Sequence, residues 1–133
     1  MSGFTPDEGE AVIADLVYKG SSADRGTSLQ LGLFTNASVS EATALAAITE
    51  PSGTGYARIP LTNASWTGAA DTRSYAKQTF TAGAGGWTGQ VRGYFIATTG
   101  TTPRLLHIEV DAAGPYTMNA SEIYEITPNC IIA

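Results

Sequence analysis

His107 is the first residue in this chain to consider for chemistry, because it is the only histidine. It lies two residues before Glu109 in an apolar segment, and alternation along a strand would place the imidazole and the carboxylate on one face. A histidine beside a carboxylate is the pattern of a general base. A zinc site needs three or four ligands, however, and the spacing supplies no second histidine, nearby cysteine or nucleophile. We therefore predict a structural strand histidine.

Three other groups have the composition of a site without its spacing. The acidic cluster of Asp7, Glu8 and Glu10 lacks the loop pattern of a calcium site and suits the first turn of a helix. The glycine-rich segment 82–86 is not followed by the Lys and Ser/Thr of a phosphate-binding loop. Cys130 is the single cysteine, cannot pair within the chain and is expected to be a small buried hydrophobe. We expect no catalytic residue, no metal ion and no cofactor, and hence no enzyme.

Length and composition favour one globular domain. The chain has 133 residues, of which 43% are hydrophobic and 14% charged, a composition well away from that of disordered proteins. No apolar run approaches the roughly 20 residues that cross a bilayer. The start of the sequence is acidic and contains neither the basic nor the apolar region of a secretory signal. We expect a soluble protein that is made in a cytoplasm and has no membrane partner.

Charge is distributed in blocks along the chain. The net charge is −5, and the amino-terminal segment is strongly acidic. Between residues 51 and 104 the balance reverses, since Asp71 is the one acid against five basic residues: Arg58, Arg73, Lys77, Arg92 and Arg104. These charges are dispersed and form no Lys/Arg run, so we expect no nucleic-acid partner. A cationic face could meet an acidic partner, but strand surfaces whose charges balance those of their neighbours are the simpler interpretation.

Residues 6–18 are predicted to form a short α-helix. Thr5, Pro6 and Glu8 have the spacing of a capping box with proline at the first helical position. Gly20 is placed to end the helix in the left-handed conformation. One face is apolar at helical spacing and consists of Val12, Ile13, Leu16 and Val17. Because so short a helix is marginal alone, we expect this face to pack on the rest of the chain or on a neighbouring subunit.

From residue 28 onward the apolar period changes to that of a strand. Residues 29–34 alternate, with leucines on one face, and predict a half-buried strand. Residues 37–50 predict a long loop with a short helical piece. Pro60 removes a hydrogen-bond donor, which indicates that the strand at residues 56–61 is an edge strand or that Pro60 lies at a strand end. Residues 94–96 are apolar at consecutive positions, which predicts a central strand buried on both faces.

Further strands are predicted at 74–81, 89–98, 104–110, 116–119, 122–127 and 129–132, and turn clusters separate most of them. About eight short strands at this spacing predict an all-β fold, an antiparallel β-sandwich or jelly roll. We therefore expect residues 21–133 to form the β-domain. The acidic helical segment 1–20 is expected to pack on it or on a neighbouring subunit.

Three phrases of the sequence carry a family resemblance. They are LQLGLFTN at residues 29–36, GYARIPL at 55–61 and RGYFIATTG at 92–100. Together they resemble head decoration, or cement, proteins of tailed bacteriophages, and the resemblance fades after about Gly100. It implies a β-sandwich or jelly-roll unit that sits as a homotrimer on the outer capsid and ties neighbouring capsomers together. No residue-level binding site is carried over by the resemblance.

The resemblance implies a non-enzymatic structural virion protein whose partner is the major capsid protein. It would be synthesised in the host cytoplasm and located on the capsid surface. We choose as interface candidates apolar, aromatic and basic residues that such contacts use: Phe4, Val12, Leu16, Arg58, Trp66, Trp87, Arg92, Ile131 and Ile132. Both tryptophans are expected to be core or interface anchors. The alternative is a tail-fibre or carbohydrate-binding module, for which Trp66, Tyr75 and Trp87 could provide aromatic platforms.

Overall fold

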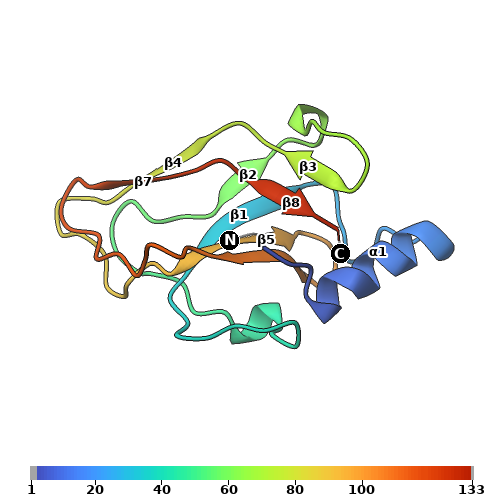
Figure 1. Cartoon of the computed structure of the whole chain (residues 1–133), viewed down its shortest axis with the longest axis horizontal. Coiled ribbons are helices and arrows are strands. Elements are labelled where there is room, and N and C mark those ends of the chain that lie inside the picture. The colour runs from blue at the N-terminus through green and yellow to red at the C-terminus, as the bar shows by residue number, and fades with distance from the viewer. Residues whose placement is uncertain (1–2, 133) are drawn as a thin grey trace.

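The computed structural model describes residues 3–132 and contains eight β-strands in antiparallel sheets with one α-helix (Figure 1). The all-β class, the single helix and the number of strands agree with the sequence prediction. The elements are α1 (Asp7–Tyr18), β1 (Leu29–Phe34), η1 (Leu45–Ala47), β2 (Ile59–Leu61), η2 (Asn63–Ser65), β3 (Thr72–Ser74), β4 (Gln78–Thr81), β5 (Gly93–Thr98), β6 (Leu105–Val110), β7 (Ile123–Ile126) and β8 (Asn129–Ile131).

The largest sheet has four antiparallel strands in the order β2-β1-β5-β6. β5 lies between β1 and β6 and is buried along its whole length, which confirms the prediction of a central strand covered on both faces. β2 is an edge strand, as Pro60 predicted. The expectation that β1 is half-buried is wrong. Phe34, on its second face, is buried because the loop that follows β1 covers that face with Val39, Leu45 and Ile48.

The three sequence phrases meet within this sheet. β1 and β5 pair so that Gly32 lies opposite Phe95 and Phe34 lies opposite Gly93. Each glycine leaves room for the phenylalanine of the other strand, since a Cβ at Gly32 would clash with the Phe95 ring and one at Gly93 with the Phe34 ring. The phrase GYARIPL contributes Arg58, whose guanidinium carbon lies 5.2 Å from the centre of the Phe95 ring. The phrases therefore form one packing unit.

A long two-stranded ribbon covers the other face of the sheet. β3 pairs with β8 and β4 with β7, and a backbone hydrogen bond from Tyr75 to Pro128 links the two pairs. Phe80 and Ile126 of the ribbon join the larger hydrophobic cluster, which also contains the leucines of β1. The strand expected at 116–119 is reduced to an isolated bridge between Val91 and Tyr116.

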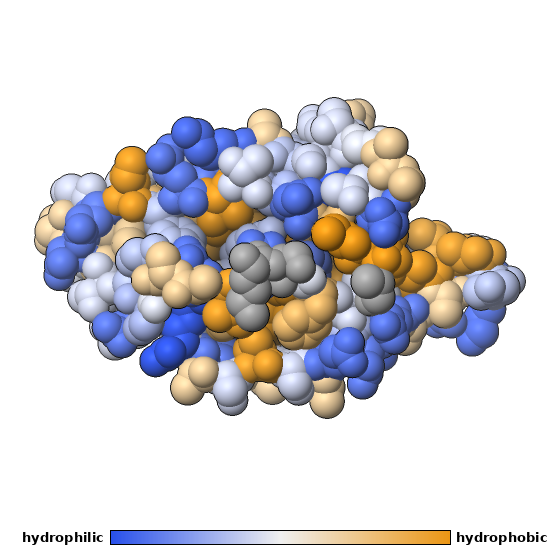
Figure 2. Space-filling model, in the orientation of Figure 1, coloured by the Kyte–Doolittle hydropathy of each residue, from blue (hydrophilic) through white to orange (hydrophobic). Residues whose placement is uncertain are grey.

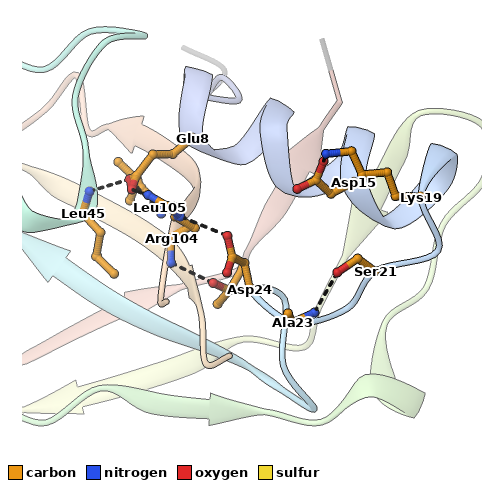
Figure 3. A network of polar contacts seen from close by, with 10 residues as sticks. Glu8, Asp15, Lys19, Ser21, Ala23, Asp24, Leu45, Arg104 and Leu105 are labelled. Atoms are coloured by element: carbon orange, nitrogen blue, oxygen red, sulfur yellow. Dashed lines mark hydrogen bonds and ion pairs between the residues drawn. The ribbon is translucent and has the colours of Figure 1, made fainter. Parts of the chain in front are cut away.

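Helix α1 is fixed at its start by the side chain of Glu8. One carboxylate oxygen accepts hydrogen bonds from the backbone N–H groups of Leu45 (2.7 Å) and Leu105 (3.3 Å), and the other lies 3.4 Å from Arg104 (Figure 3). The predicted capping box is therefore wrong. Pro6 is the N-cap residue and provides no side-chain cap. The Thr5 hydroxyl donates instead to the carbonyl of Ile131, which ties the start of the helix to β8.

The second half of α1 extends beyond the end of the sheet (Figure 1). Val12 is buried, but Leu16 is 42% exposed, Val17 68% and Tyr18 88%. The last turn of the apolar face therefore does not pack on the rest of the chain, and the alternative expectation that it packs on a neighbouring subunit stays a prediction. An apolar surface runs along the projecting helix onto the body of the molecule (Figure 2). As predicted, Gly20 follows the helix in the left-handed conformation.

Candidate binding cleft between helix α1 and the β3–β8 pair

An apolar cleft of about 290 Å³ opens beside α1, between the end of the four-stranded sheet and the β3–β8 pair. Residues from all three parts line it, together with four residues from outside these elements: Thr5, Arg25, Trp66 and Ile132. The complete lining is Thr5, Ile13, Arg25, Leu29, Trp66, Arg73, Ile96, Leu106, His107, Cys130, Ile131 and Ile132. Its volume is close to the lower limit of typical small-molecule sites, which are also mostly apolar with a few polar groups.

A β-bulge in the edge strand β6 shapes the floor of the cleft. Ile96 of β5 pairs with His107, whereas the next residue, Ala97, pairs with Leu105, so that Leu106 is left without a partner in β5. Bulges re-aim side chains, and this one brings two consecutive residues to the same side of the strand. Leu106 and His107 both line the cleft as a result.

His107 is buried within this floor with 2% of its surface exposed. Neither ring nitrogen has a hydrogen-bond partner in residues 3–132. The Glu109 carboxylate lies on the same face, as the sequence predicted, but 3.9 Å from Nε2, too far for a hydrogen bond. Burial lowers the pKa of His107 to about 4, because desolvation penalises the charged imidazolium. The imidazole is therefore neutral at pH 7.

Trp66 forms one wall and has the second unpartnered group. Its indole packs edge-on against Tyr75, with ring centres 5.1 Å apart. The indole N–H is buried and has no acceptor within the described chain. Among residues 3–132, the buried side-chain polar atoms without a partner are this nitrogen and the two of His107, and both residues line the same cleft. Buried polar groups in native proteins are almost always paired, so their concentration here singles out the cleft.

The charged groups of the cleft are all basic. Arg25 donates to the carbonyl of Gly26 and to the side chain of Asn63, and Arg73 donates to the backbone carbonyls of Ala70 and Thr72. No carboxylate of residues 3–132 forms an ion pair with either guanidinium, and none lines the cleft. Burial raises the pKa of the Cys130 thiol to about 12, so this group is neutral as well.

The structure brings only part of the predicted interface set together. Trp66, Ile131 and Ile132 line the cleft, and Leu16 lies one helical turn beyond Ile13, which also lines it. The others lie elsewhere. Phe4 packs against the smaller hydrophobic cluster, and Val12 lies on the buried side of α1. Arg92 lines a separate pocket together with Phe34.

Two other members of that set have roles inside the chain. Trp87 is 7% exposed and its indole N–H donates to the carbonyl of Thr54. It is therefore an anchor of the core and not of an interface. Arg58 makes two hydrogen bonds to the Glu50 carboxylate, at 2.9 and 3.1 Å. Arg58 and two further members of the basic block are ion-paired, Lys77 with Glu125 and Arg104 with both Glu8 and Asp24. The interpretation of balanced strand charges fits these pairs.

Several cleft residues are not predicted from the sequence as part of a site. Ile13 was assigned to the helix face, but Arg25, Leu29, Arg73 and Leu106 carried no signal of a shared site. They come from separate elements, and their proximity depends on strand register and on the bulge at position 106. Within residues 3–132 no group of three or more His, Cys, Asp or Glu side chains could hold a metal ion. The same part of the chain contains no helix that is long and apolar enough to span a membrane.

Comparisons of the sequence and structure with known protein families, curated proteins and solved structures found no match.

Proposed function

We propose that the chain is a non-enzymatic structural protein of a virion, which binds the outer surface of a phage capsid and cements neighbouring capsomers. In this proposal it is a β-sandwich of the jelly-roll type, acts as a homotrimer and has the major capsid protein as its partner. The three sequence phrases support the family, and an exposed apolar surface supports a role in assembly. The protein reaches the capsid surface after synthesis in the host cytoplasm.

The projecting half of α1 is the observation that carries the proposal. Leu16, Val17 and Tyr18 are largely exposed there, and Ile132 is 53% exposed at the mouth of the adjacent cleft. Exposed apolar residues gathered at one place on a small domain mark a surface that a protein partner covers. If this surface binds only to the assembled capsid lattice, binding of the protein stabilises that lattice by mass action.

Capsids that lack the protein provide the direct test. Purified protein added to mature, expanded capsids should bind in trimer-equivalent numbers and raise the temperature at which the capsids melt. Unexpanded precursor capsids should bind it weakly, because the lattice contacts that it bridges are not yet formed. Absence of binding to expanded capsids, with the protein shown to be folded, would refute the proposal.

Two matched variants locate the binding surface. Val17→Asp places a charge on the projecting helix, and Ile123→Asp places one on β7 at the opposite end of the molecule (Figure 1), where Ile123 is also exposed. Val17→Asp should weaken capsid binding on the order of tenfold or more, because a buried charge at an interface core is costly. Ile123→Asp should bind as the unmodified chain does. Equal loss in both variants would contradict the assignment of the surface to α1.

The carbohydrate-binding alternative receives no specific support from the arrangement of the aromatic residues. A sugar platform requires an exposed ring face, and Trp87 is buried in the core. Trp66 and Tyr75 pack edge-on against each other rather than side by side as a flat surface. Binding of the isolated chain to a glycan array would favour this alternative over the capsid proposal.

A further inference from the structure

We propose that the cleft between α1 and the β3–β8 pair is a binding site for a small apolar carboxylate, such as a medium-chain fatty acid, with its chain inside the cleft and its carboxylate toward Arg25 and Arg73. This inference goes beyond the proposed function and does not depend on it. It rests on the shape of the cleft, the unpartnered polar atoms around it and the sign of its charge.

The walls favour an apolar ligand body. Six of the lining residues are aliphatic and come from α1, from three strands of the four-stranded sheet and from the end of the ribbon: Ile13, Leu29, Ile96, Leu106, Ile131 and Ile132. Transfer of each CH₂ group from water to such a surface favours binding. The volume of about 290 Å³ limits the chain to medium length.

The polar groups favour a ligand that accepts hydrogen bonds. Guanidinium and indole N–H groups only donate, and a neutral imidazole supplies one further N–H. The Thr5 hydroxyl is already used by the carbonyl of Ile131. Because the lining contains no carboxylate, the cleft has donors in excess and a positive sign. A carboxylate complements both properties, whereas an amine or a quaternary ammonium group would be repelled by the arginines.

The buried nitrogens of Trp66 and His107 that have no partner in residues 3–132 favour a ligand-binding role for the cleft. A buried donor without a partner is unfavourable, and the indole of Trp66 and the imidazole of His107 both have buried nitrogens without a partner in residues 3–132. Within residues 3–132 neither group has an acceptor, since the Glu109 carboxylate lies 3.9 Å from His107 and accepts from Tyr94. The carboxylate of a bound ligand would bring into the cleft an acceptor that the described residues do not supply. Ordered water is the competing occupant.

Decanoate is a suitable probe because it combines a medium-length chain with a carboxylate. Calorimetry with the full chain at pH 7.5 should show one site per chain, and decan-1-ol and decyltrimethylammonium should bind on the order of tenfold more weakly or not at all. The fluorescence of Trp66 should change on binding, and Trp66→Phe should abolish the change while Trp87 remains. No heat and no fluorescence change with millimolar decanoate would overturn the proposal, as would equal binding of the alcohol.

Two arginine variants distinguish binding of decanoate in the cleft from nonspecific binding by overall charge. Arg73→Gln removes a charge from the rim, and Arg92→Gln removes one from a surface outside the cleft. Arg73→Gln should weaken decanoate binding on the order of tenfold and Arg92→Gln should leave it unchanged. Equal effects would show binding by overall charge and would overturn the site. Thermal unfolding of both variants verifies that they fold.

A crystal grown with decanoate identifies the occupant. Chain density along the aliphatic wall, with the carboxylate at the two arginines, is the expected result. Ordered water alone in the cleft would overturn the proposal. A second copy of the chain seated there, together with loss of self-association in Arg73→Gln by analytical ultracentrifugation, would also overturn it and would assign the cleft to an interface between subunits.

Discussion

Gly32 of β1 lies directly opposite Phe95 of β5, and the Phe95 ring occupies the space that a side chain at position 32 would need. The ring cannot easily move away, because Phe95 is fully buried and Arg58 lies over it. Gly32→Ala should therefore lower the free energy of unfolding by about 1–3 kcal/mol, as expected when a methyl group is forced into a packed core. Urea denaturation monitored by circular dichroism measures this difference.

The loop glycine Gly85 provides the control for this substitution. It has no heavy atom within 4 Å of a Cβ added to it, and its φ is not positive. Gly85→Ala should change the free energy of unfolding by no more than about 0.5 kcal/mol. In the double variant Gly32→Ala, Phe95→Leu, part of the loss should be recovered because the smaller side chain makes room. A Gly32→Ala protein as stable as the Gly85→Ala protein would disprove the proposed packing.

The three phrases show which part of this fold could be predicted from sequence. Period-two alternation located β1, consecutive apolar residues predicted the buried position of β5, and Pro60 predicted the edge position of β2. Those signals belong to one strand each. The pairing of Gly32 with Phe95 depends on the register between strands far apart in sequence, which no pattern within one strand contains.

Glu8 holds the first turn of α1 against the sheet, and its removal should destabilise the protein. Its carboxylate is the acceptor for the backbone N–H groups of Leu45 and Leu105. Glu8→Ala leaves both donors without this partner, and we expect a loss of about 1–3 kcal/mol in the free energy of unfolding. Glu10→Ala is the matched control, since Glu10 lies on the same helix and is exposed. A loss of similar size in the two variants would contradict the role of Glu8.

The role of Glu8 also explains why the capping prediction failed. The spacing of Thr5 and Glu8 satisfies a local rule for helix starts, but both side chains are used by segments distant in sequence. Thr5 contacts β8, and Glu8 contacts the first residue of η1 and the start of β6. Tertiary hydrogen bonds of this kind replace local caps whenever the helix start lies against other elements.

Cys130 should be unreactive toward thiol reagents in the folded protein. Burial raises its pKa to about 12, so the nucleophilic thiolate is a very small fraction at pH 8. Modification by iodoacetamide at pH 8, followed by mass spectrometry, should be much slower than for a free thiol with a pKa near 8.5. In urea above the unfolding transition the rate should rise to that of the free thiol. Rapid modification without denaturant would contradict the burial of this group.

The cleft was much less predictable than the strands. His107 and Cys130 were expected to be structural, and Trp66 was expected to be an anchor, but nothing in their spacing placed them together. Their convergence depends on the bulge at Leu106, which lets His107 and Leu106 share one side of β6. A strict alternation would have put them on opposite faces, and sequence alone does not locate an inserted residue.

Protonation of His107 should destabilise the protein as the pH falls from about 6.5 to about 4. The unfolded-state pKa is near 6.5 and the folded-state pKa is about 4, so between these values the unfolded chain binds the extra proton. The loss of stability is close to zero above pH 6.5, grows as the pH falls through this window and amounts to about 3 kcal/mol at its acidic end. Glu109 faces the same region, and burial raises its pKa, which weakens its ability to stabilise an imidazolium at low pH.

Because the chain has one histidine, nuclear magnetic resonance measures its titration directly. The shift of the His107 Cε1–H signal should have its midpoint near pH 4 in the folded protein, and near pH 6.5 in urea. His107→Leu separates this effect from that of the carboxylates, which titrate in the same range. When the profile of His107→Leu is subtracted from that of the unmodified chain, the remaining loss in the free energy of unfolding should develop between pH 6.5 and pH 4. A folded-state midpoint near pH 6.5, or identical profiles, would mean that the imidazole is solvated rather than buried.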